Sequence, residues 1–250
     1  GRSVRCVAPS VAEDPAPEVS GFGGIKKMQD MTTEICTKAT ANSTGQLYDS
    51  RDNSIYTVGK LSDGKCWMTQ NLRIVGKTIT PSSSDVSTKY AIPESTTSGW
   101  STTDFAATNV FYDGDETYGA YYTWCAATAN SCLEATEANA NAASSICPKG
   151  WKIPTSAEFT KLTAPGGTWG PVNGINGSTI GGAFFPAGSY YLNGLADRTS
   201  RGFLWTSTAS SSSSAFFLLF YQDYLNPAYS PEGRQRIQRN YGVPIRCIAK

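Results

Sequence analysis

The sequence predicts a single domain of the α+β class that is mainly β, and two of its stretches carry that prediction. Residues 46–74 contain three β-rich runs separated by turn residues, including Asp63-Gly64, and indicate a three-stranded meander. Near the C-terminus, the run AFFLLFY is apolar on both faces, which predicts a central strand buried on both sides. Few segments show helical spacing, so the helices should be few and short.

Three segments are nevertheless expected to be helical. From Ile25 to Ile35, apolar residues recur at helical spacing, and the Ala-rich stretch from Leu133 to Ile146 has a composition that suits a helix. In CPKGWKIPTSAEFTKL, Thr155 is followed three residues later by Glu158, which is the capping-box spacing. That motif predicts a helix running to about Leu162.

The chain divides into three parts. Residues 1–8 alternate as a strand does, residues 9–24 have the composition of an extended, acidic, Pro-rich linker, and residues 25–250 form the domain. At about residues 77–119 the domain is Ser/Thr-rich with scattered aromatics, which predicts a long, ordered surface insertion. Further strands are expected near residues 183–191, 203–208, 215–221, 236–239 and 244–248.

Charge and composition exclude several classes of function. Lys and Arg number 21 against 20 Asp and Glu, so no global field favours nucleic acid. The sequence has no apolar run of the roughly 20 residues that span a bilayer, so we expect no membrane insertion. It also has no histidine, which excludes Ser-His and Cys-His catalysis, and no two carboxylates stand in a motif. We therefore expect a non-catalytic protein.

The seven cysteines point to disulfides. Zinc sites usually use histidine or paired C-x-x-C motifs, and the sequence contains neither. Disulfides in an oxidising compartment are the better interpretation, so we expect an extracellular or cell-surface protein that needs no metal and no cofactor.

Five motifs give the chain a family resemblance. In order, they are GKCWMTQNL, YYTW, CPKGWKIPTSAEF, FLWTSTAS and GVPIRCIA. Together they resemble the Fibrobacter succinogenes major paralogous (FISUMP) domain family from about residue 28 to 249. The resemblance implies a C-type-lectin-like fold in the last third and a bacterial secreted or surface protein, in which such domains often occur in tandem. It implies no reaction.

The resemblance also suggests how the cysteines pair. Cys147 and Cys247 resemble the long-range bridge of C-type-lectin-like domains, which ties a helix to the final strand. Two further pairs are expected from position: Cys36–Cys66 flanks the first two runs of the meander, and Cys125–Cys132 closes a local loop. Cys6 is then left without a partner.

Four tryptophans lie in the motifs, at Trp67, Trp124, Trp151 and Trp205. Each could be a platform for a ligand, but packing in the core is the favoured interpretation.

Metal-dependent and enzymatic sites are poorly supported. The dipeptide Asn226-Pro227 lacks the carboxylate that a calcium-dependent lectin site needs in front of it. The acidic turn YDGDETYG at residues 112–119 is better explained as a solvated turn than as a cation site. Formylglycine-generating enzymes share the broad fold, but Cys125 and Cys132 lack the flanking residues expected of their redox pair.

The candidate ligand surface lies between the Trp-Ser/Thr strand and the final Arg-Cys strand, where diversified C-type-lectin-like proteins meet their ligands. Residues 207–242 match that region and are rich in Tyr, Asn, Ser and Arg, which are typical of adaptable binding surfaces. A polar loop surface without a partner explains the composition equally well. The candidate residues are Tyr221, Asp223, Tyr224, Asn226, Tyr229, Arg234, Arg236, Arg239 and Asn240.

The sequence contains its last strand twice. GRSVRCVA at residues 1–8 aligns without a gap with GVPIRCIA at residues 242–249: four positions are identical, and valine replaces isoleucine at two more. Three explanations are open. Residues 1–8 could be the last strand of a preceding tandem domain, a donor strand that enters a neighbouring subunit, or a strand beside that of Cys247 in its own domain.

The second explanation builds a filament, because a head-to-tail contact does not close on itself. Its assembly residues are Val4, Arg5, Cys6 and Val7, and Cys6 could lock the joint covalently.

We therefore expect a non-catalytic structural or adhesive protein, a subunit of an extracellular filament assembled head-to-tail through its N-terminal strand. Its partners would be further copies of itself, as a homo-oligomer or filament, and a surface glycan or protein ligand. The alternative is a ligand-binding module of a larger tandem-domain adhesin that does not self-assemble.

Overall fold

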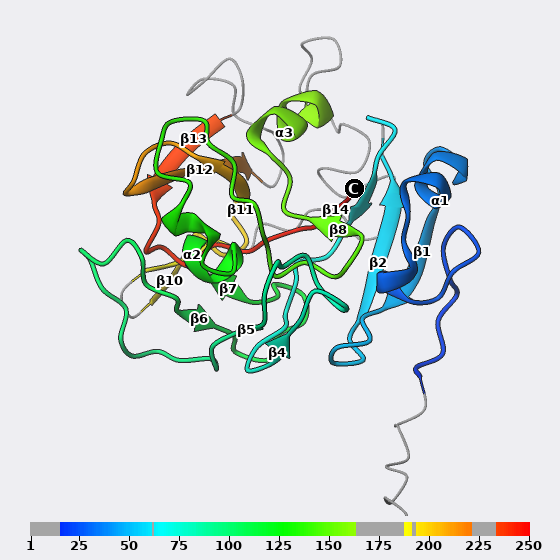
Figure 1. Cartoon of the computed structure of the whole chain (residues 1–250), viewed down its shortest axis with the longest axis horizontal. Helices are drawn as coiled ribbons and strands as arrows, with labels where there is room; N and C mark the ends of the chain where they lie inside the picture. The colour runs from blue at the N-terminus through cyan, green and yellow to red at the C-terminus, as the bar shows by residue number, and fades with distance from the viewer. Residues whose placement is uncertain (1–15, 62, 164–187, 192–193, 222–233) are drawn as a thin grey trace, which may run out of the picture.

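The computed structural model describes residues 16–61, 63–163, 188–191, 194–221 and 234–250 (Figure 1). Two sheets dominate it: a five-stranded sheet in the order β1-β2-β3-β14-β8 and a three-stranded sheet in the order β11-β12-β13. In Figure 1 the first sheet lies at the right and the second at the left, and the red C-terminal segment crosses between them. The expected mainly β, α+β class is confirmed.

The predicted meander forms one half of the five-stranded sheet. Its antiparallel strands are β1 (Thr44–Tyr48), β2 (Ile55–Lys60) and β3 (Cys66–Met68). On the far side of β3 lies the last strand of the chain, β14 (Ile248–Ala249), which also pairs with β8 (Trp151–Lys152). The chain therefore closes the sheet with its final residues.

The three-stranded sheet is made of β11 (Arg201–Ala209), β12 (Ser214–Tyr221) and β13 (Arg234–Gln238). The run AFFLLFY lies in β12, which is the central strand of this sheet. Successive side chains of a strand face opposite sides of the sheet, and the successive residues Phe217 and Leu218 are only 4% and 2% exposed. The prediction of a central strand buried on both sides is thus confirmed.

The helix expected from Ile25 to Ile35 is wrong in its bounds. A 3₁₀ turn, η1 (Met28–Asp30), comes first, and α1 (Thr33–Lys38) begins only after Thr32. The Thr32 side chain accepts a hydrogen bond from the Ile35 amide, so it caps a new helix there. The cap explains why the apolar spacing does not extend into one continuous helix.

The helix expected from Leu133 to Ile146 does not form. Only η2 (Ser131–Leu133) touches it, and the residues that follow pair with the edge of β11. The amides of Asn139 and Ala142 donate to the carbonyls of Ala209 and Ser207. Backbone pairing with a buried strand has therefore outweighed the helix propensity of alanine.

The capping-box helix is confirmed as α3 (Ser156–Thr163). The Glu158 amide donates to Thr155 Oγ1 over 3.2 Å, and the Thr155 amide donates to Glu158 Oε2 over 2.9 Å. Glu158 also forms ion pairs with Lys65 and Lys152, so the cap is tied to strand β8 and to the residue before β3.

The middle of the chain, which includes residues 77–119, has few regular elements. Its short elements are two-stranded ladders and turns: β4 (Thr78–Ile79) with β5 (Tyr90–Ala91), and β6 (Val110–Phe111) with β7 (Tyr121–Tyr122). Helix α2 (Trp124–Ala127) follows, and the hairpin of β9 (Ser189–Tyr191) and β10 (Gly194–Ala196) precedes β11. No helix in the described ranges is long and apolar enough to cross a membrane.

Among the described residues the structure contains three disulfides. They join the pairs expected from position, Cys36–Cys66 and Cys125–Cys132, and the pair implied by the family resemblance, Cys147–Cys247.

The four motif tryptophans are core residues, as the favoured interpretation held. Each is fully buried, and each indole N–H donates to a protein acceptor. The acceptors are the carboxylate of Asp63 for Trp67, and the carbonyls of Thr206, Met28 and Tyr122 for Trp124, Trp151 and Trp205.

The cap makes the stability of the fold depend on pH. Burial tends to raise the pKa of Glu158, but hydrogen bonds from Thr155 and Lys152 and the nearby lysine charges outweigh it, and the pKa is lowered to about 2 from the ordinary 4.5. The carboxylate therefore stabilises the fold above about pH 4.5, and this contribution is lost as the pH falls through about 2. Glu158→Gln should lower the melting temperature by about 2–4 °C at pH 7.

The difference in melting temperature between the wild type and Glu158→Gln should disappear as the pH approaches 2. Thermal unfolding followed by circular dichroism measures this difference. Glu34→Gln is the matched control, because Glu34 pairs with Lys38 on the exposed surface. A constant gap from pH 7 to pH 2 would contradict the assignment.

Candidate functional site

The segment from Gly242 to Ala249 contacts several elements of the domain, and we call it the closing segment. All eight of its residues are buried. It is also the C-terminal copy of the duplicated strand. We call it the home copy, and the domain that contains it the home domain. Its surroundings show which side chains each position of such a strand accommodates.

The backbone of the closing segment bonds to both halves of the domain. Val243 and Tyr122 exchange two hydrogen bonds, and the Trp205 amide donates to the Pro244 carbonyl over 3.1 Å. Further along, the amides of Leu72 and Met68 donate to the carbonyls of Ile245 and Cys247 over 3.0 and 2.9 Å. The segment thus joins β7 and β11 to the loop after β3 before it enters the five-stranded sheet as β14.

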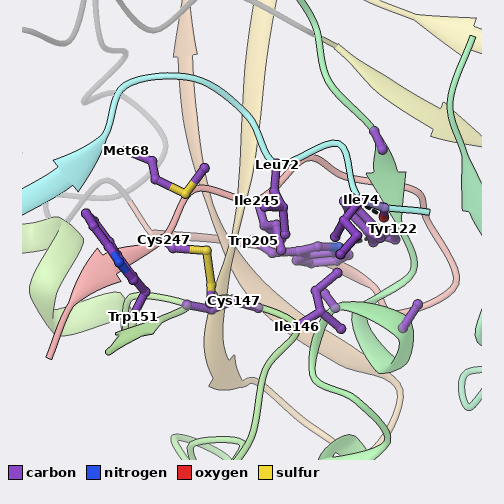
Figure 2. Close-up of a cluster of buried hydrophobic side chains, with 14 of the residues drawn as sticks. Met68, Leu72, Ile74, Tyr122, Ile146, Cys147, Trp151, Trp205, Ile245 and Cys247 are labelled. Carbon is purple, nitrogen blue, oxygen red and sulfur yellow. Dashed lines mark hydrogen bonds between the residues drawn. A yellow bond between two sulfur atoms is a disulfide. The ribbon is translucent and has the colours of Figure 1, made fainter. Parts of the chain in front are cut away.

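One set of side chains of the closing segment enters the main hydrophobic core. Val243, Ile245, Cys247 and Ala249 alternate along the chain and all belong to it. In Figure 2, Ile245 lies beside Leu72 and Trp205, and Cys247 forms its disulfide with Cys147. The disulfide closes a loop of 100 residues, which in the chain-entropy account contributes about 4–5 kcal/mol.

Between these apolar residues lies a buried arginine. Arg246 is 1% exposed, and its Nε donates to Asn71 Oδ1 over 2.7 Å. Burial lowers the pKa of Arg246 to about 9, so the guanidinium remains mainly protonated at neutral pH. Asn71 is held in turn by the Tyr118 carbonyl, which accepts from its Nδ2 over 2.7 Å. A buried charged group is unfavourable unless it is hydrogen-bonded, so the contact with Asn71 favours the register of the segment in which the two side chains meet.

The segment begins at a glycine for a steric reason. A Cβ at Gly242 would lie 2.7 Å from the Trp100 ring and 3.0 Å from Tyr190 Cβ. Gly242 and Tyr190 also exchange two backbone hydrogen bonds, so the close approach is part of the fold.

The predicted assembly residues Val4, Arg5, Cys6 and Val7 lie outside the described residues. Among the predicted ligand-binding residues, Asp223, Tyr224, Asn226 and Tyr229 lie outside them too. Tyr221 ends β12 and Arg234 begins β13, and Arg236 is exposed on β13.

Arg239 and Asn240 are placed inside the protein instead. Arg239 is 2% exposed, lies 4.2 Å from the Trp124 ring and donates to the carbonyls of Cys132, Ala135 and Ser211. Asn240 is 1% exposed and donates to the Ser101 carbonyl. Both side chains therefore pack the fold and offer little area to a ligand.

An aromatic cluster, which the sequence interpretation missed, lies next to Asn240. Tyr190 stacks on Phe111, with ring centroids 4.3 Å apart, and lies 4.6 Å from Trp100. On the other side of β9, Tyr191 stacks on Tyr241 at 3.9 Å. The scattered aromatics of the insertion were the available signal, but the spacing of Trp100 and Tyr190 in the sequence gives no indication that they meet.

The acidic turn at residues 112–119 holds arginines. Asp113 forms an ion pair with Arg198 at 2.8 Å, and Glu116 forms one with Arg73 at 3.5 Å. In the part of the chain that the structure describes, no three His, Cys, Asp or Glu side chains are grouped to hold a metal ion.

A polar hollow of about 270 Å³ lies beside the C-terminal residue and is lined partly by Asp85, Lys152 and Lys250. Burial raises the pKa of Asp85, although Lys250 and Ser145 oppose the shift. The two carboxylate oxygens are engaged separately, one by Lys250 Nζ and the other by Ser145 Oγ, each at 2.6 Å. The carboxylate is therefore occupied within the protein.

Comparison with known proteins supports the family resemblance over part of the chain. Residues 62–170 match the family model of the Fibrobacter succinogenes major domain, which spans β3 to α3 and contains three of the five motifs. No curated protein and no solved structure matches the chain significantly. The C-type-lectin-like fold accordingly stays a prediction.

The register of the closing segment can be tested through Asn71. Asn71→Ala removes the acceptor of the buried Arg246 N–H and should lower stability by about 2 kcal/mol, or the melting temperature by about 4–8 °C. Differential scanning calorimetry measures the shift. Asn109→Ala is the matched control, because Asn109 is partly exposed and makes one 3.3 Å bond to the Gly99 carbonyl. Equal shifts in the two variants would contradict the role given to Asn71.

Proposed function

We propose that this chain is a non-catalytic structural or adhesive module of a secreted or cell-surface protein, and that residues 1–8 are the closing strand of a second domain of the same fold. One observation carries the proposal. The N-terminal copy keeps the residues on which the home copy depends: a glycine where a Cβ would clash, the buried arginine and the disulfide cysteine.

Among the described residues, both sides of the closing segment are already occupied. Strand β14 is paired on both sides, by β3 and by β8, and the start of the closing segment is bonded on both sides by Tyr122 and Tyr190. The arrangement speaks against the explanation in which the N-terminal strand lies beside that of Cys247 in its own domain. It favours an acceptor elsewhere.

The N-terminal residues that the structure describes contact the five-stranded sheet at a strand that is not next to β14. Gly21 pairs with Gln46 on the outer edge of β1, and the Gln46 amide donates to Ser20 Oγ. β1 is the first strand of the five-stranded sheet and β14 is the fourth. Residues 20 and 21 therefore contact an edge strand that is separated from β14 by β2 and β3. Two arrangements satisfy the proposal: a head-to-tail filament, or a larger protein in which residues 1–8 close another domain.

An extracellular location is supported by the three disulfides, which form and persist in oxidising compartments. The alternative function is a ligand-binding module that does not self-assemble. It is supported by the stacked rings of Tyr191 and Tyr241, which are partly exposed, and by the exposed Arg236 on β13.

The destination of Cys6 tests the proposal. In the protein isolated from the cells that make it, we expect Cys6 in a disulfide with a cysteine outside the three pairs of the home domain. Non-reducing peptide mapping by mass spectrometry identifies the partner, and the Cys247 peptide is the internal control, because it should remain joined to Cys147. A free Cys6 thiol in that material would overturn the proposal.

Deleting residues 1–8 gives a second test. Because the home domain already contains its closing segment, the deletion should change its melting temperature by less than about 1 °C and should abolish the Cys6 linkage. A loss of several degrees would show that residues 1–8 belong to the home domain.

A further inference from the structure

The two copies of the closing strand differ at four positions, and at two of these the chemical character of the side chain changes. Arg2 stands where the home copy has Val243, and Ser3 stands where it has Pro244. The structure shows what these positions require, so it bears on which domain can accept residues 1–8. This inference rests on the proposed function.

Position 243 is an apolar core position. Val243 is fully buried, belongs to the main hydrophobic core, and exchanges two backbone hydrogen bonds with Tyr122, which is itself fully buried. Trp205 contacts the same strand, because its indole N–H donates to the Tyr122 carbonyl over 2.8 Å. An arginine here would place a guanidinium in the core, where an unpaired charge is strongly unfavourable.

Position 244 makes a second, smaller demand. Pro244 is buried and has no N–H, while its carbonyl accepts from the Trp205 amide. Serine in its place would bring a buried N–H and a hydroxyl that both need acceptors. The remaining positions fit, because Val4 and Val7 are smaller than Ile245 and Ile248, and Arg5, Cys6 and Ala8 are identical to their counterparts.

We infer that residues 1–8 close a domain of the same fold but of different sequence, one that accommodates Arg2 where this chain buries Val243, rather than a second copy of this chain. Gly1 and residues 4–8 carry the features shared by both domains, and Arg2 with Ser3 selects between them. An identical copy is doubly unsuitable, because its own closing segment already occupies the position and is held there by the Cys147–Cys247 disulfide. A homopolymer built through this strand is therefore disfavoured.

Two double variants of the full chain test the two halves of the inference separately. I245V/I248V gives the home segment the apolar residues of the N-terminal copy, and V243R/P244S gives it the residues of Arg2 and Ser3. We expect I245V/I248V to form the Cys147–Cys247 disulfide fully, with a melting temperature lower by about 2–8 °C. We expect V243R/P244S to yield at least about tenfold less of that disulfide after oxidative refolding.

Val243→Met separates charge from size, because methionine is long but apolar, and it should form the disulfide more completely than V243R/P244S. Disulfide mapping and thermal unfolding provide both readouts. Failure of I245V/I248V to close would overturn the proposed function itself. Complete closure of V243R/P244S with a shift of less than about 2 °C would overturn the inference alone, since an identical copy could then accept residues 1–8.

The wild-type chain provides an independent check. Produced alone, it should remain monomeric in size-exclusion chromatography with light scattering and should keep a free Cys6 thiol. Disulfide-linked ladders in which Cys6 is joined to Cys147 of another copy would contradict the inference and support the filament.

Discussion

The closing segment is the constraint on which the rest of the structure depends. Its eight residues contribute to the hydrophobic core, to the backbone pairing of β7, β11 and β3, and to the longest disulfide loop of the domain. The two main sheets are otherwise built from separate parts of the chain. Residues 242–249 contact both sheets although they lie far from most of their partners in the sequence, and long-range pairing of this kind is costly in loop entropy.

The features that the sequence predicted well are local ones. The meander, the capping box of Thr155 and Glu158, and the two-sided burial of β12 all follow from patterns in short, continuous stretches of the sequence. The disulfide of Cys147 and Cys247 spans 100 residues, and it was expected only because the family resemblance implied it.

Two of the failures share one physical cause, unlike the helix expected from Ile25, which is interrupted by the local cap at Thr32. The stretch from Leu133 to Ile146 has helical composition, yet the amides of Asn139 and Ala142 bond to the edge of β11 at Ala209 and Ser207, which lie 70 and 65 residues later in the sequence. Arg239 and Asn240 have the chemistry of a binding surface, but a buried tryptophan ring and distant carbonyls hold them inside. Tertiary partners of this kind leave no signal in a local pattern.

The duplicated strand gains its meaning from the way in which the home copy is held. A match of composition alone would fit any edge strand, whereas a glycine without room for a Cβ, a buried arginine on Asn71 and a bridging cysteine are specific demands. The same demands distinguish partners, because the mismatch of Arg2 against Val243 matters only where that position is sealed from water. Under the proposal, the positions shared by the two copies specify the fold of the acceptor domain, and the differing positions specify which domain of that fold accepts residues 1–8.

Native-state amide hydrogen exchange tests most directly whether the closing segment unites the domain. The Leu72 amide donates to the carbonyl of Ile245, and the Trp205 amide donates to that of Pro244, so both are protected by the same segment although they lie in different halves. The account predicts one shared free energy of opening for the two amides, equal to that of global unfolding. Two clearly different values, with one half opening while the other stays protected, would contradict it.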